Sequence, residues 1–527
     1  MKNKKYPYYP APDLKNLQEL VAYCADNYGD KTAFHYLSKK EEIKRSYKDF
    51  FEDVAAFSRF LINKGYKRTH IALLGENSYE WLVSYFAVIN SNNVVVPLDK
   101  EMTAENLASI IRRSDSAAII FSPTYEEEAT ANEGIDFINM KSLQTIIRDN
   151  KTPDTSATTF FNSIEIDNDA ICALVYTSGT TSEPKGVMLS HKNIASDAVA
   201  TLRNSTVPDS SILVLPLHHT YAIILAISVP MLVGSSIFIN KSLRTLMPDI
   251  SYCKPKYIAV VPLMMEIFYK KITENLKSNG KEDLISKLLV VSNILRKIGI
   301  DLRRKFFSKI IDAFGGRLEL IAVGGAPING KTVTALTDFG IQVLGGYGTT
   351  ECSPIVSSVR NRHFCPDSSG SVIPGTQVRI KENELQIKGD IVFLGYYKDP
   401  NATEQAFDGE WYKTGDICTI EDGFLYIKGR CKNLIVFSNG ENVSPESLEL
   451  VLQDNIPEIE EVVVYNQEDI LIAEMFVSVW TDELKERINS FIDSFNKSQP
   501  TYRKIGKVLF RADEFEKTTT KKIKRTH

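Results

Sequence analysis

The chain alternates segments of helical periodicity with short apolar runs. Apolar positions recur every three or four residues in one set of segments, which predicts amphipathic helices at residues 17–28, 47–64, 80–91 and 103–114. Short β-rich runs bounded by Gly, Pro and Asn predict strands at residues 70–74, 93–97, 117–121, 211–216, 236–239, 257–261, 318–323 and 342–344. This alternation predicts an α/β fold.

After about residue 370 the pattern changes to short strands and turns. Strands are predicted at residues 377–380, 384–388, 411–416, 417–421 and 424–428. Helices at 445–453 and 482–498 then alternate with strands at 461–465, 472–479 and near 507–510, and the first of these helices would have Ser444 as its N-cap and Pro445 at its first position. Because 527 residues exceed a single core, we predict two domains, residues 1–430 and 431–527, with a helical layer rich in Lys, Arg and Leu at about 266–316.

Composition excludes several classes of protein. Apolar residues make up 43% of the chain and charged residues 24%, as in soluble globular proteins. The net charge of -4 gives no bulk attraction to nucleic acid. Seven scattered cysteines form no metal-binding pattern and favour a reducing compartment. With no signal-peptide pattern and no apolar run near 18 residues, we expect a cytoplasmic protein with at most peripheral membrane contact.

The most informative chemistry lies in a loop that follows an apolar run. Its sequence is Thr177-Ser178-Gly179-Thr180-Thr181-Ser182-Glu183-Pro184-Lys185-Gly186. Gly allows close backbone approach, hydroxyl groups donate hydrogen bonds, and Lys185 can aim an ammonium at a phosphate. A P-loop is disfavoured because Pro184 stands where its second Gly should be. By itself, the loop could also be a Ser/Thr-rich surface turn.

Three more motifs follow in order along the chain. The first, Gly345-Gly346-Tyr347-Gly348-Thr349-Thr350-Glu351, combines an aromatic ring, hydroxyls and a carboxylate of the kind that Mg²⁺ prefers beside phosphate oxygens. In the second, Tyr412-Lys413-Thr414-Gly415-Asp416, a carboxylate at a strand end can accept hydrogen bonds from ribose hydroxyls. The third is the basic segment 517–525. Each alone also fits a structural role: a packed aromatic, a helix-start charge, an ordinary turn or a solvated tail.

Together and in this order, the motifs resemble the adenylate-forming superfamily of acyl-CoA synthetases, peptide-synthetase adenylation domains and luciferases. The resemblance spans nearly the whole chain. It implies a large N-terminal domain of two stacked α/β subdomains plus a distorted β-barrel, followed by a small mobile C-terminal α/β domain. The helical insert and the sequence Val-Phe-Ser-Asn-Gly-Glu-Asn-Val at 436–443 look most like bacterial long-chain fatty acid CoA ligases.

The resemblance implies a site for ATP and Mg²⁺. It assigns the phosphate cradle to Thr177, Ser178, Gly179, Thr180, Thr181 and Lys185. It assigns the adenine side and its surroundings to Gly324, Gly325, Ala326, Pro327, Gly346, Tyr347, Gly348 and Thr349. It implies that Thr350 contacts the α-phosphate, that Thr177 and Glu351 hold Mg²⁺, and that Asp416 and Arg430 hold the ribose.

The resemblance also implies catalytic and moving parts. Lys522 aligns with the lysine that bridges the carboxylate and the α-phosphate. Lys432 is the pivot about which the C-terminal domain turns, and Gly440 lies in the loop that borders the CoA pantetheine tunnel. His219 would lie near the acyl carboxylate and assist thioester formation, with His218 the less favoured of the pair.

Two positions depart from the family pattern. Ser182 stands where the first loop usually has Gly; if that position needs φ > 0, Ser costs about 1 kcal/mol or more and stiffens the loop. Lys521 replaces a Gly in the last motif, so the spacing to the following Ile and Arg is what selects Lys522.

We therefore predict an AMP-forming acyl-CoA synthetase. A carboxylic acid, by resemblance a fatty acid, would react with ATP to give acyl-AMP and pyrophosphate, and CoA would then take the acyl group. The acyl pocket is expected from residues 221–226, 261–266, 324–327 and 352–354. The alternative is an enzyme that loads an acyl or aryl acid onto the phosphopantetheine of an acyl carrier protein. A non-catalytic relative is disfavoured by the intact set Glu351, Asp416, Arg430 and Lys522.

Overall fold

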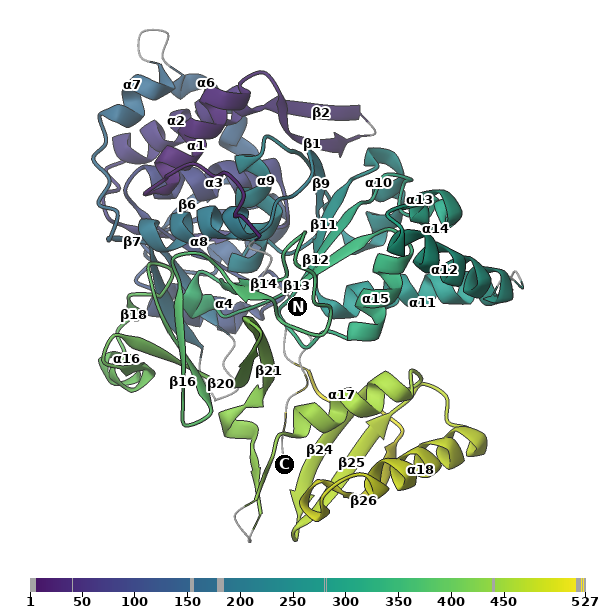
Figure 1. The fold of residues 1–527 in the computed structure, drawn as a ribbon. Helices are drawn as coiled ribbons and strands as arrows, with labels where there is room; N and C mark the ends of the chain where they lie inside the picture. The colour runs from purple at the N-terminus through teal and green to yellow at the C-terminus, as the bar shows by residue number, and fades with distance from the viewer. Residues whose placement is uncertain are drawn as a thin grey trace.

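The structure is a computed structural model that describes residues 6–39, 41–151, 156–177, 184–278, 280, 282–437, 441–517, 523 and 525. Its elements gather into two α/β sheets, an antiparallel β region and a small α/β domain at the end of the chain (Figure 1). This agrees with the predicted α/β architecture. None of the helices in the described part of the chain combines the length and the hydrophobicity needed to span a bilayer.

The first α/β sheet has the strand order β18-β8-β7-β4-β3-β5-β6. Strands β7, β4, β3, β5 and β6 run parallel, whereas β8 returns antiparallel to β7 and pairs with β18. The bounds are β3 (His70–Leu74), β4 (Val94–Pro97), β5 (Ala118–Phe121), β6 (Asp136–Asn139), β7 (Ile171–Thr177), β8 (Lys185–Ser190) and β18 (Gly395–Tyr396). The antiparallel turn from β7 to β8 therefore frames the Ser/Thr/Gly loop.

The second α/β sheet has the order β15-β14-β13-β12-β11-β9-β10-β1-β2. Its centre is parallel, and β2, β14 and β15 add antiparallel edges. The bounds are β1 (Thr32–Ser38), β2 (Glu41–Ser46), β9 (Ser210–Leu213), β10 (Ser236–Ile239), β11 (Tyr257–Val260), β12 (Leu320–Val323), β13 (Gln342–Gly348), β14 (Ile355–Ser358) and β15 (Ser371–Val372). Because β9, β11, β12 and β13 are parallel, the loops after them meet at one edge, where open α/β sheets bind ligands.

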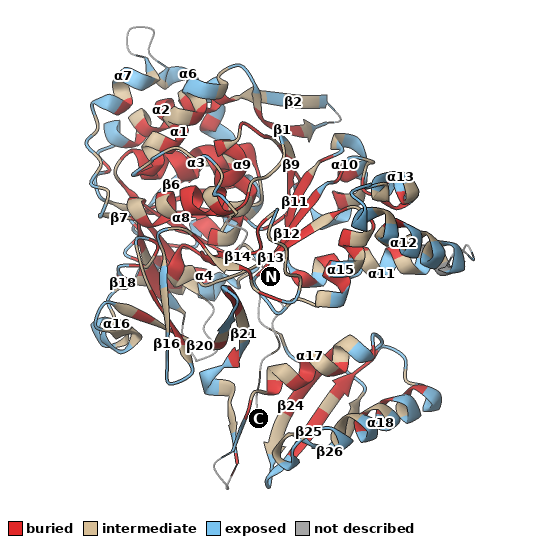
Figure 2. Ribbon diagram, in the orientation of Figure 1, coloured by how far each residue is buried: buried red, intermediate tan, exposed pale blue. Residues whose placement is uncertain are grey.

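Helices cover both sheets (Figure 2), and most bury their apolar faces in one large core, whereas α4 and α5 pack in a second apolar cluster. Their bounds are α1 (Leu17–Tyr28), α2 (Tyr47–Asn63), α3 (Tyr79–Asn90), α4 (Ala104–Arg113), α5 (Glu126–Thr130), α6 (Leu143–Asn150), α7 (Ala157–Asn162), α8 (His191–Asn204), α9 (Val229–Leu232), α10 (Leu246–Cys253), α11 (Pro262–Ser278), α12 (Glu282–Lys297), α13 (Arg303–Phe306), α14 (Ser308–Asp312) and α15 (Gly330–Asp338). The four predicted N-terminal helices are confirmed to within a residue or two. Ser46 begins α2 through a reciprocal capping box with Asp49.

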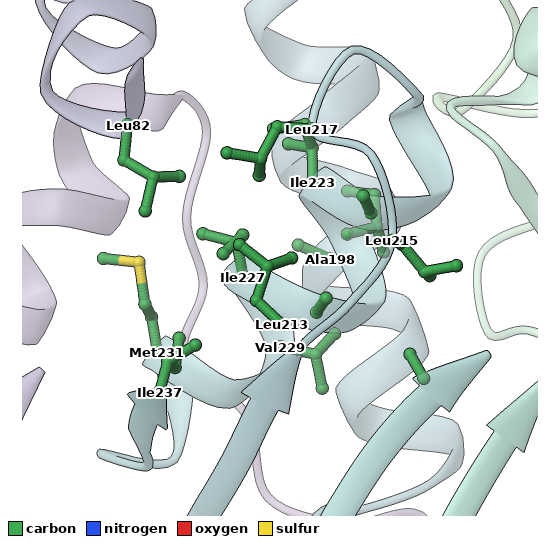
Figure 3. Packing of buried hydrophobic residues seen from close by; sticks show 14 of the residues in the cluster. Leu82, Ala198, Leu213, Leu215, Leu217, Ile223, Ile227, Val229, Met231 and Ile237 are labelled. Atoms are coloured by element: carbon green, nitrogen blue, oxygen red, sulfur yellow. The ribbon is translucent and has the colours of Figure 1, made fainter. Parts of the chain in front are cut away.

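The most apolar stretch of the sequence forms a wide π-helical turn, η3 (Ala222–Ser228), that continues into α9. Figure 3 shows side chains of this segment, including Ile223 and Ile227, gathered with Leu82 of α3 and Leu213 of β9. The segment packs over the second sheet and so covers the apolar space behind the carboxyl ends of its strands.

The third region of the large body is a five-stranded antiparallel sheet. Its elements are β16 (Gln377–Lys381), β17 (Glu384–Lys388), α16 (Pro400–Ala406), β19 (Phe407–Asp408), β20 (Trp411–Glu421) and β21 (Phe424–Arg430). The two strands predicted at 411–416 and 417–421 are one continuous strand, because Gly415, at φ 70°, is accommodated within it.

The end of the chain folds around its own apolar cluster, which includes Leu448, Val464, Met475 and Ile488. The elements are β22 (Ile435–Val436), β23 (Asn442–Val443), α17 (Pro445–Asn455), β24 (Glu461–Gln467), β25 (Ile470–Phe476), α18 (Asp482–Lys497) and β26 (Ile505–Arg511). Helix α17 begins as predicted, but the Ser444 side chain does not cap it. Its hydroxyl donates instead to the Lys428 carbonyl oxygen at 2.6 Å.

Candidate active site

Strand pairing fixes the two ends of the Ser/Thr/Gly loop. Thr177 at the end of β7 lies opposite Lys185 at the start of β8, and Tyr176 lies opposite Gly186. An Arg113 guanidinium nitrogen donates to the Pro184 carbonyl oxygen at 3.0 Å. The predicted cradle residues between these ends, Ser178, Gly179, Thr180 and Thr181, and the substituted Ser182, lie outside the described residues.

The Gly-rich turn follows β13 directly, as its sequence predicts. Strand β14 folds back on β13 so closely that a Cβ on Gly348 would overlap the Pro354 carbonyl oxygen, and one on Gly346 would lie 3.0 Å from the Ser357 carbonyl oxygen. Gly348 therefore requires glycine for space, and Gly346 leaves little room for a side chain. The turn ends in the short helix η5 (Thr350–Cys352), which carries Thr350 and Glu351.

Glu351 and Lys185 both contact Tyr396, a residue that the sequence did not identify as part of the site. The Tyr396 hydroxyl donates to Glu351 Oε1 at 2.9 Å, and Lys185 Nζ lies 4.9 Å from the centroid of the Tyr396 ring. Burial, reinforced by the Glu351 charge, raises the pKa of Tyr396, so its hydroxyl stays protonated and donates. Tyr396 lies on β18, which pairs with β8. The only signal was an aromatic pair before a Lys-Asp-Pro turn, which does not identify a partner.

A second cluster joins Tyr347, Asp416 and Arg430. The Tyr347 hydroxyl donates to Asp416 Oδ2 at 2.5 Å, and Arg430 Nε lies 2.9 Å from Asp416 Oδ1. Asp416 and Arg430 are direct partners in the β20–β21 ladder, and Asp416 is buried. Burial alone would lower the pKa of Arg430, but the Asp416 carboxylate together with Tyr347, Tyr412 and Glu351 outweighs burial and raises that pKa. The Tyr347 hydroxyl stays protonated because burial and Asp416 raise its pKa.

Aromatic packing connects the two clusters. The Phe393 ring contacts the rings of Tyr396 and Tyr412, with centroid separations of 4.9 and 5.2 Å. The Phe393 N–H also donates to the Glu351 carbonyl oxygen at 2.9 Å. The predicted carboxylate and ribose groups therefore belong to one packed unit.

The predicted turn at 324–327 lies beside this unit. Gly324 is buried, and a Cβ there would lie 3.2 Å from the Gly346 carbonyl oxygen and 3.5 Å from the Tyr221 ring. Gly325 has φ 89°, and together with Ala326 and Pro327 it is exposed. The structure thus brings the 324–327 turn and the Gly-rich turn together. Thr349 Oγ1, in the Gly-rich turn, is buried.

The two adjacent histidines follow β9. Their ring centroids are 4.0 Å apart, and both side chains are partly buried. Burial lowers the pKa of His218 well below its usual range, so it is neutral at pH 7. His218 Nε2 lies 3.7 Å from Asp99 Oδ1, beyond hydrogen-bonding distance. His219 precedes Tyr221, which borders the 324–327 turn.

A small cavity of about 30 Å³ lies behind the turns. Most of its lining is apolar or aromatic: Val207, Tyr221, Leu225, Val229, Tyr257, Leu320, Ala322, Val323, Leu344, Gly346 and Ile355, with Thr201, Ser205 and Ser358. Of the four predicted stretches only 221–226 contributes. The Tyr257 hydroxyl donates to the Leu225 carbonyl oxygen at 2.9 Å, so this tyrosine presents mainly its ring to the cavity.

The C-terminal candidates are only partly described. Lys432 is exposed and sits in the short helix η6 (Cys431–Asn433) between β21 and the last domain, whereas Gly440 and Lys522 lie outside the described residues. Two residues that follow Lys522 in the last motif are anchored. Ile523 packs in an apolar cluster with Phe476 and Phe515, and Arg525 forms two hydrogen bonds with the Glu449 carboxylate.

The donor set suits a nucleotide with Mg²⁺. Glu351 supplies a carboxylate at the turn and Thr177 a hydroxyl at the loop, and Mg²⁺ favours one or two carboxylates together with phosphate oxygens and water. No cluster of three or more His, Cys, Asp or Glu side chains occurs among the described residues.

Comparisons with protein families cover most of the chain. Residues 21–397 match the family described as AMP-binding enzyme. Residues 432–527 match the AMP-binding enzyme C-terminal domain.

Curated relatives are more distant. The chain is 27% identical over 462 residues to long-chain-fatty-acid–CoA ligase 5 of Rattus norvegicus, an alignment that covers 78% of this chain and 68% of the relative. It is 26% identical over 561 residues to the chloroplastic long-chain-fatty-acid–acyl-carrier-protein ligase AEE15 of Arabidopsis thaliana, covering 86% and 75%. The fold is similar to o-succinylbenzoate coenzyme A synthetase (MenE) of Bacillus subtilis in complex with ATP and magnesium ion, with a TM-score of 0.72, 20% identity and coverage of 96% and 98%.

Proposed function

The chain belongs to the AMP-binding enzyme family, and from that premise we propose that it joins a fatty acid to CoA in two steps. Membership makes it an adenylate-forming ligase. In the adenylation step, a carboxylate oxygen attacks the α-phosphorus of ATP; the new O–P bond gives acyl-AMP as the bond to pyrophosphate breaks. In the thioester step, the CoA thiol loses its proton, its sulfur attacks the acyl carbon, and AMP leaves.

The observation that carries the proposal is the pair of joined clusters around the Gly-rich turn. We propose that Tyr347 packs against adenine while Asp416, held by Tyr347 and Arg430, accepts hydrogen bonds from the ribose hydroxyls. Both carboxylate oxygens are already oriented by a donor, so little reorganisation is needed when the nucleotide binds. Gly324, Gly325, Ala326 and Pro327 would line the adenine and acyl sides.

The phosphate side would be formed by the first loop and the turn. Residues 177–181 and Lys185 would cradle the phosphates, and Thr350 would donate to the α-phosphate. Glu351 and Thr177 would hold Mg²⁺, which when bound offsets charge on the phosphate oxygens. Tyr396 would orient Glu351 for that role, because its hydroxyl occupies one carboxylate oxygen and leaves the other for the ion.

The C-terminal domain would supply the catalytic cation. We propose that Lys522 lies across the substrate carboxylate and the α-phosphate, where an ammonium stabilises the charge that develops during attack. The anchors at Ile523 and Arg525 support this assignment because they hold the chain directly after Lys522. His219 would assist the thioester step from the end of β9.

The domain boundary would lie between residues 430 and 431, with Lys432 as the pivot. In the short helix η6, the Asn433 side-chain amide donates to Glu446 Oε1 at 2.5 Å. A turn about Lys432 would replace the adenylation face of the small domain with the loop that contains Gly440, which would border the CoA pantetheine.

The apolar cavity supports a hydrocarbon acid as substrate. Its lining carries no charged residue, and burial of a charged substrate tail there would cost several kcal/mol or more. The similarity to a long-chain-fatty-acid–CoA ligase supports the same class. The similarity to an acyl-carrier-protein ligase favours one alternative, transfer to a carrier-protein phosphopantetheine instead of CoA.

Pyrophosphate release tests the proposal. The protein would be mixed with ATP, Mg²⁺ and short, medium, long-chain or aromatic acids, alone, with CoA, or with a phosphopantetheinylated carrier protein. We expect release to depend on a fatty acid and to accelerate with CoA. Acceleration by the carrier protein alone would establish the alternative acceptor, and no acid-dependent release with any acid would contradict the ligase.

A further inference from the structure

Exposed apolar side chains concentrate on one part of the molecule, the helices α11 and α12 and the turn after them. Nine of the 20 large hydrophobic residues exposed in the described part of the chain fall within 40 residues: Val261, Leu263, Ile267, Leu284, Val290, Val291, Ile294, Ile298 and Ile300. Single exposed apolar residues are ordinary, but a cluster of this size marks an interaction surface.

Helix α12 is apolar on two sides. One side packs on the main core through Ile285, Leu288 and Leu289. On the other side, Val290 and Ile294 are 62% and 57% exposed, and at 100° per residue they point away from the packed side. Ile298, in the turn directly after α12, is 69% exposed. A helix that is hydrophobic all round is normally buried, yet α12 lies at the edge of the molecule (Figure 2). The outer side of α12 is therefore an exposed apolar surface.

The charge around α12 is positive. Residues 262–317 contain 12 Lys and Arg against 6 Asp and Glu, although the whole chain has a net charge of -4. Lys287 and Lys297 project from the same outer side, and both are exposed. Neither forms an ion pair among the described residues. Their charges are therefore available to an anionic partner.

We propose that this outer face of α12, formed by Leu284, Val290, Val291, Ile294 and Ile298 with Lys287 and Lys297, docks on an anionic phospholipid bilayer. An interfacial helix inserts its apolar side chains at the boundary between headgroups and acyl chains, while lysines extend to the lipid phosphates. Docking of this kind is peripheral and needs no spanning helix.

The composition of the face favours a bilayer over a protein partner. Protein interfaces are enriched in Tyr, Trp and Arg and depleted in Lys. The α12 outer face has the reverse composition, aliphatic side chains with lysines and no aromatic residue. A second copy of the chain would also bring Lys287 and Lys297 toward like charges, which opposes dimerisation through this face. The inference goes beyond the proposed reaction and does not depend on which acid is used.

Vesicle flotation with the full chain tests the proposal. The probes are vesicles of phosphatidylcholine alone and vesicles with about a third phosphatidylglycerol, at low and high salt. We expect binding to the anionic vesicles that weakens with salt. The triple variant Val290→Ser, Ile294→Ser, Ile298→Ser should bind at least about tenfold more weakly, because it removes most of the inserted apolar area.

The matched control changes three equally exposed apolar residues elsewhere, Leu243→Ser, Ile420→Ser and Val479→Ser, which are 62%, 43% and 71% exposed. The control should float like the wild type, and both variants should keep acid-dependent pyrophosphate release, which shows that they fold. Absence of wild-type binding, or equal binding by the α12 variant, would overturn the proposal. The proposal would also be overturned if no form bound vesicles and the wild type formed a concentration-dependent dimer that the α12 variant did not form. That result would assign the face to a second copy of the chain.

Discussion

The nucleotide-site clusters and the C-terminal domain differ in how they are held. In the large body, Tyr347, Asp416 and Arg430 come from three strands and are joined by hydrogen bonds through one buried carboxylate. Glu351 is fixed by Tyr396 within the same packing. These groups are positioned by strand register, which cannot change without breaking a sheet.

The C-terminal domain has its own core. Among the described residues, its contacts with the body include exposed polar ones: the Ser444 hydroxyl donates to the Lys428 carbonyl oxygen at 2.6 Å, and Lys331 Nζ donates to the Asp454 carbonyl oxygen at 2.9 Å and to Asn455 Oδ1 at 3.4 Å. Exposed polar contacts stabilise by only about 1 kcal/mol each. From this difference we predict that the proposed nucleotide binding and the proposed domain movement are separable, so substitutions in the two regions should affect the two reaction steps differently.

The largest effect should come from the C-terminal region. Lys522→Ala should slow acyl-AMP formation by about 10³-fold, because an ammonium positioned on developing charge is worth several kcal/mol. Thioester formation from supplied acyl-AMP should be spared, since the proposed turn about Lys432 would carry Lys522 away from the site before that step. Pyrophosphate release and CoA consumption measure the two steps. The neighbouring Lys521→Ala is the control and should change the rates of both steps very little. An equal loss of both steps in Lys522→Ala would contradict the role assigned to Lys522.

A substitution in the fixed region should impair both steps. Asp416→Asn should lower both rates by about 10²-fold, because AMP must be held in each. Asn keeps the acceptor for the Tyr347 hydroxyl but loses the charge facing Arg430. The two steps are assayed as above, with Thr419→Ala, at an exposed side-chain contact further along β20, as the control. Loss of adenylation alone would contradict a fixed platform.

A substitution at the pivot should separate the steps. Lys432→Pro fixes φ and disfavours the helical backbone of the preceding residue, so rotation should slow and acyl-AMP should accumulate, with overall turnover reduced about tenfold. Quenched-flow measurement of bound acyl-AMP checks this. Lys432→Ala, which keeps the backbone free, is the control, and full turnover by the proline variant would show that the pivot lies elsewhere.

A smaller effect should follow from the hydroxyl that orients Glu351. Tyr396→Phe keeps the ring under Lys185 but removes one hydrogen bond worth about 1 kcal/mol. The Mg²⁺ concentration for half-maximal adenylation should rise about fivefold, with little change in the maximal rate. The adjacent Tyr397→Phe removes an equivalent bond to the remote Asp115 and should leave the Mg²⁺ dependence unchanged; an equal shift in both variants would mean that Tyr396 is only structural.

The smallest effect concerns two buried carboxyls, one in each region. Burial raises the pKa of Asp197 in α8 well above its unfolded value of 3.8, although the Ile355 N–H donates to it. Stability from a raised pKa is fully present below about pH 3.8 and is lost as the pH rises toward the folded pKa. Asp197→Asn should therefore raise Tm, and by more at pH 8 than at pH 5.

Glu449 in the C-terminal domain provides the contrast, because Arg525 pairs with its carboxylate. Glu449→Gln should lower Tm at pH 8 by leaving Arg525 without its partner charge. Calorimetry across this pH range measures both variants. A Tm change of the same sign in both would show that the pairing does not distinguish the two regions.

The sequence predicted many elements close to their observed bounds, because the local periodicity of apolar residues indicates both helices and strands. The helices 17–28 and 47–64 and the strands 70–74 and 236–239 are examples. It did not predict β1 and β2, whose alternation is interrupted by polar residues, or the π-helical turn η3, whose apolar run fits several backbones equally well.

The sequence predicted only part of the site, because some contacts in the site join residues that lie far apart in the chain. The motif residues Tyr347, Glu351, Asp416 and Arg430 were identified, and the structure brings them into two joined clusters. Their roles remain predictions. Tyr396 was missed, since its link to Glu351 depends on β18 pairing with β8 across more than 200 residues of chain. The exposed apolar side of α12 could not be predicted from the sequence either. Apolar residues occur on two sides of that helix, and only the tertiary packing shows which side is buried.

The sequence by itself determined the types of element, the tight glycine turns and the chemical groups that suit a nucleotide, because these depend on neighbours within a few residues. Only the tertiary structure decided which groups share a hydrogen bond, which residues line the cavity and which apolar faces stay exposed. Those properties arise from strand register and long-range burial, where residues far apart in the chain compete for the same contacts.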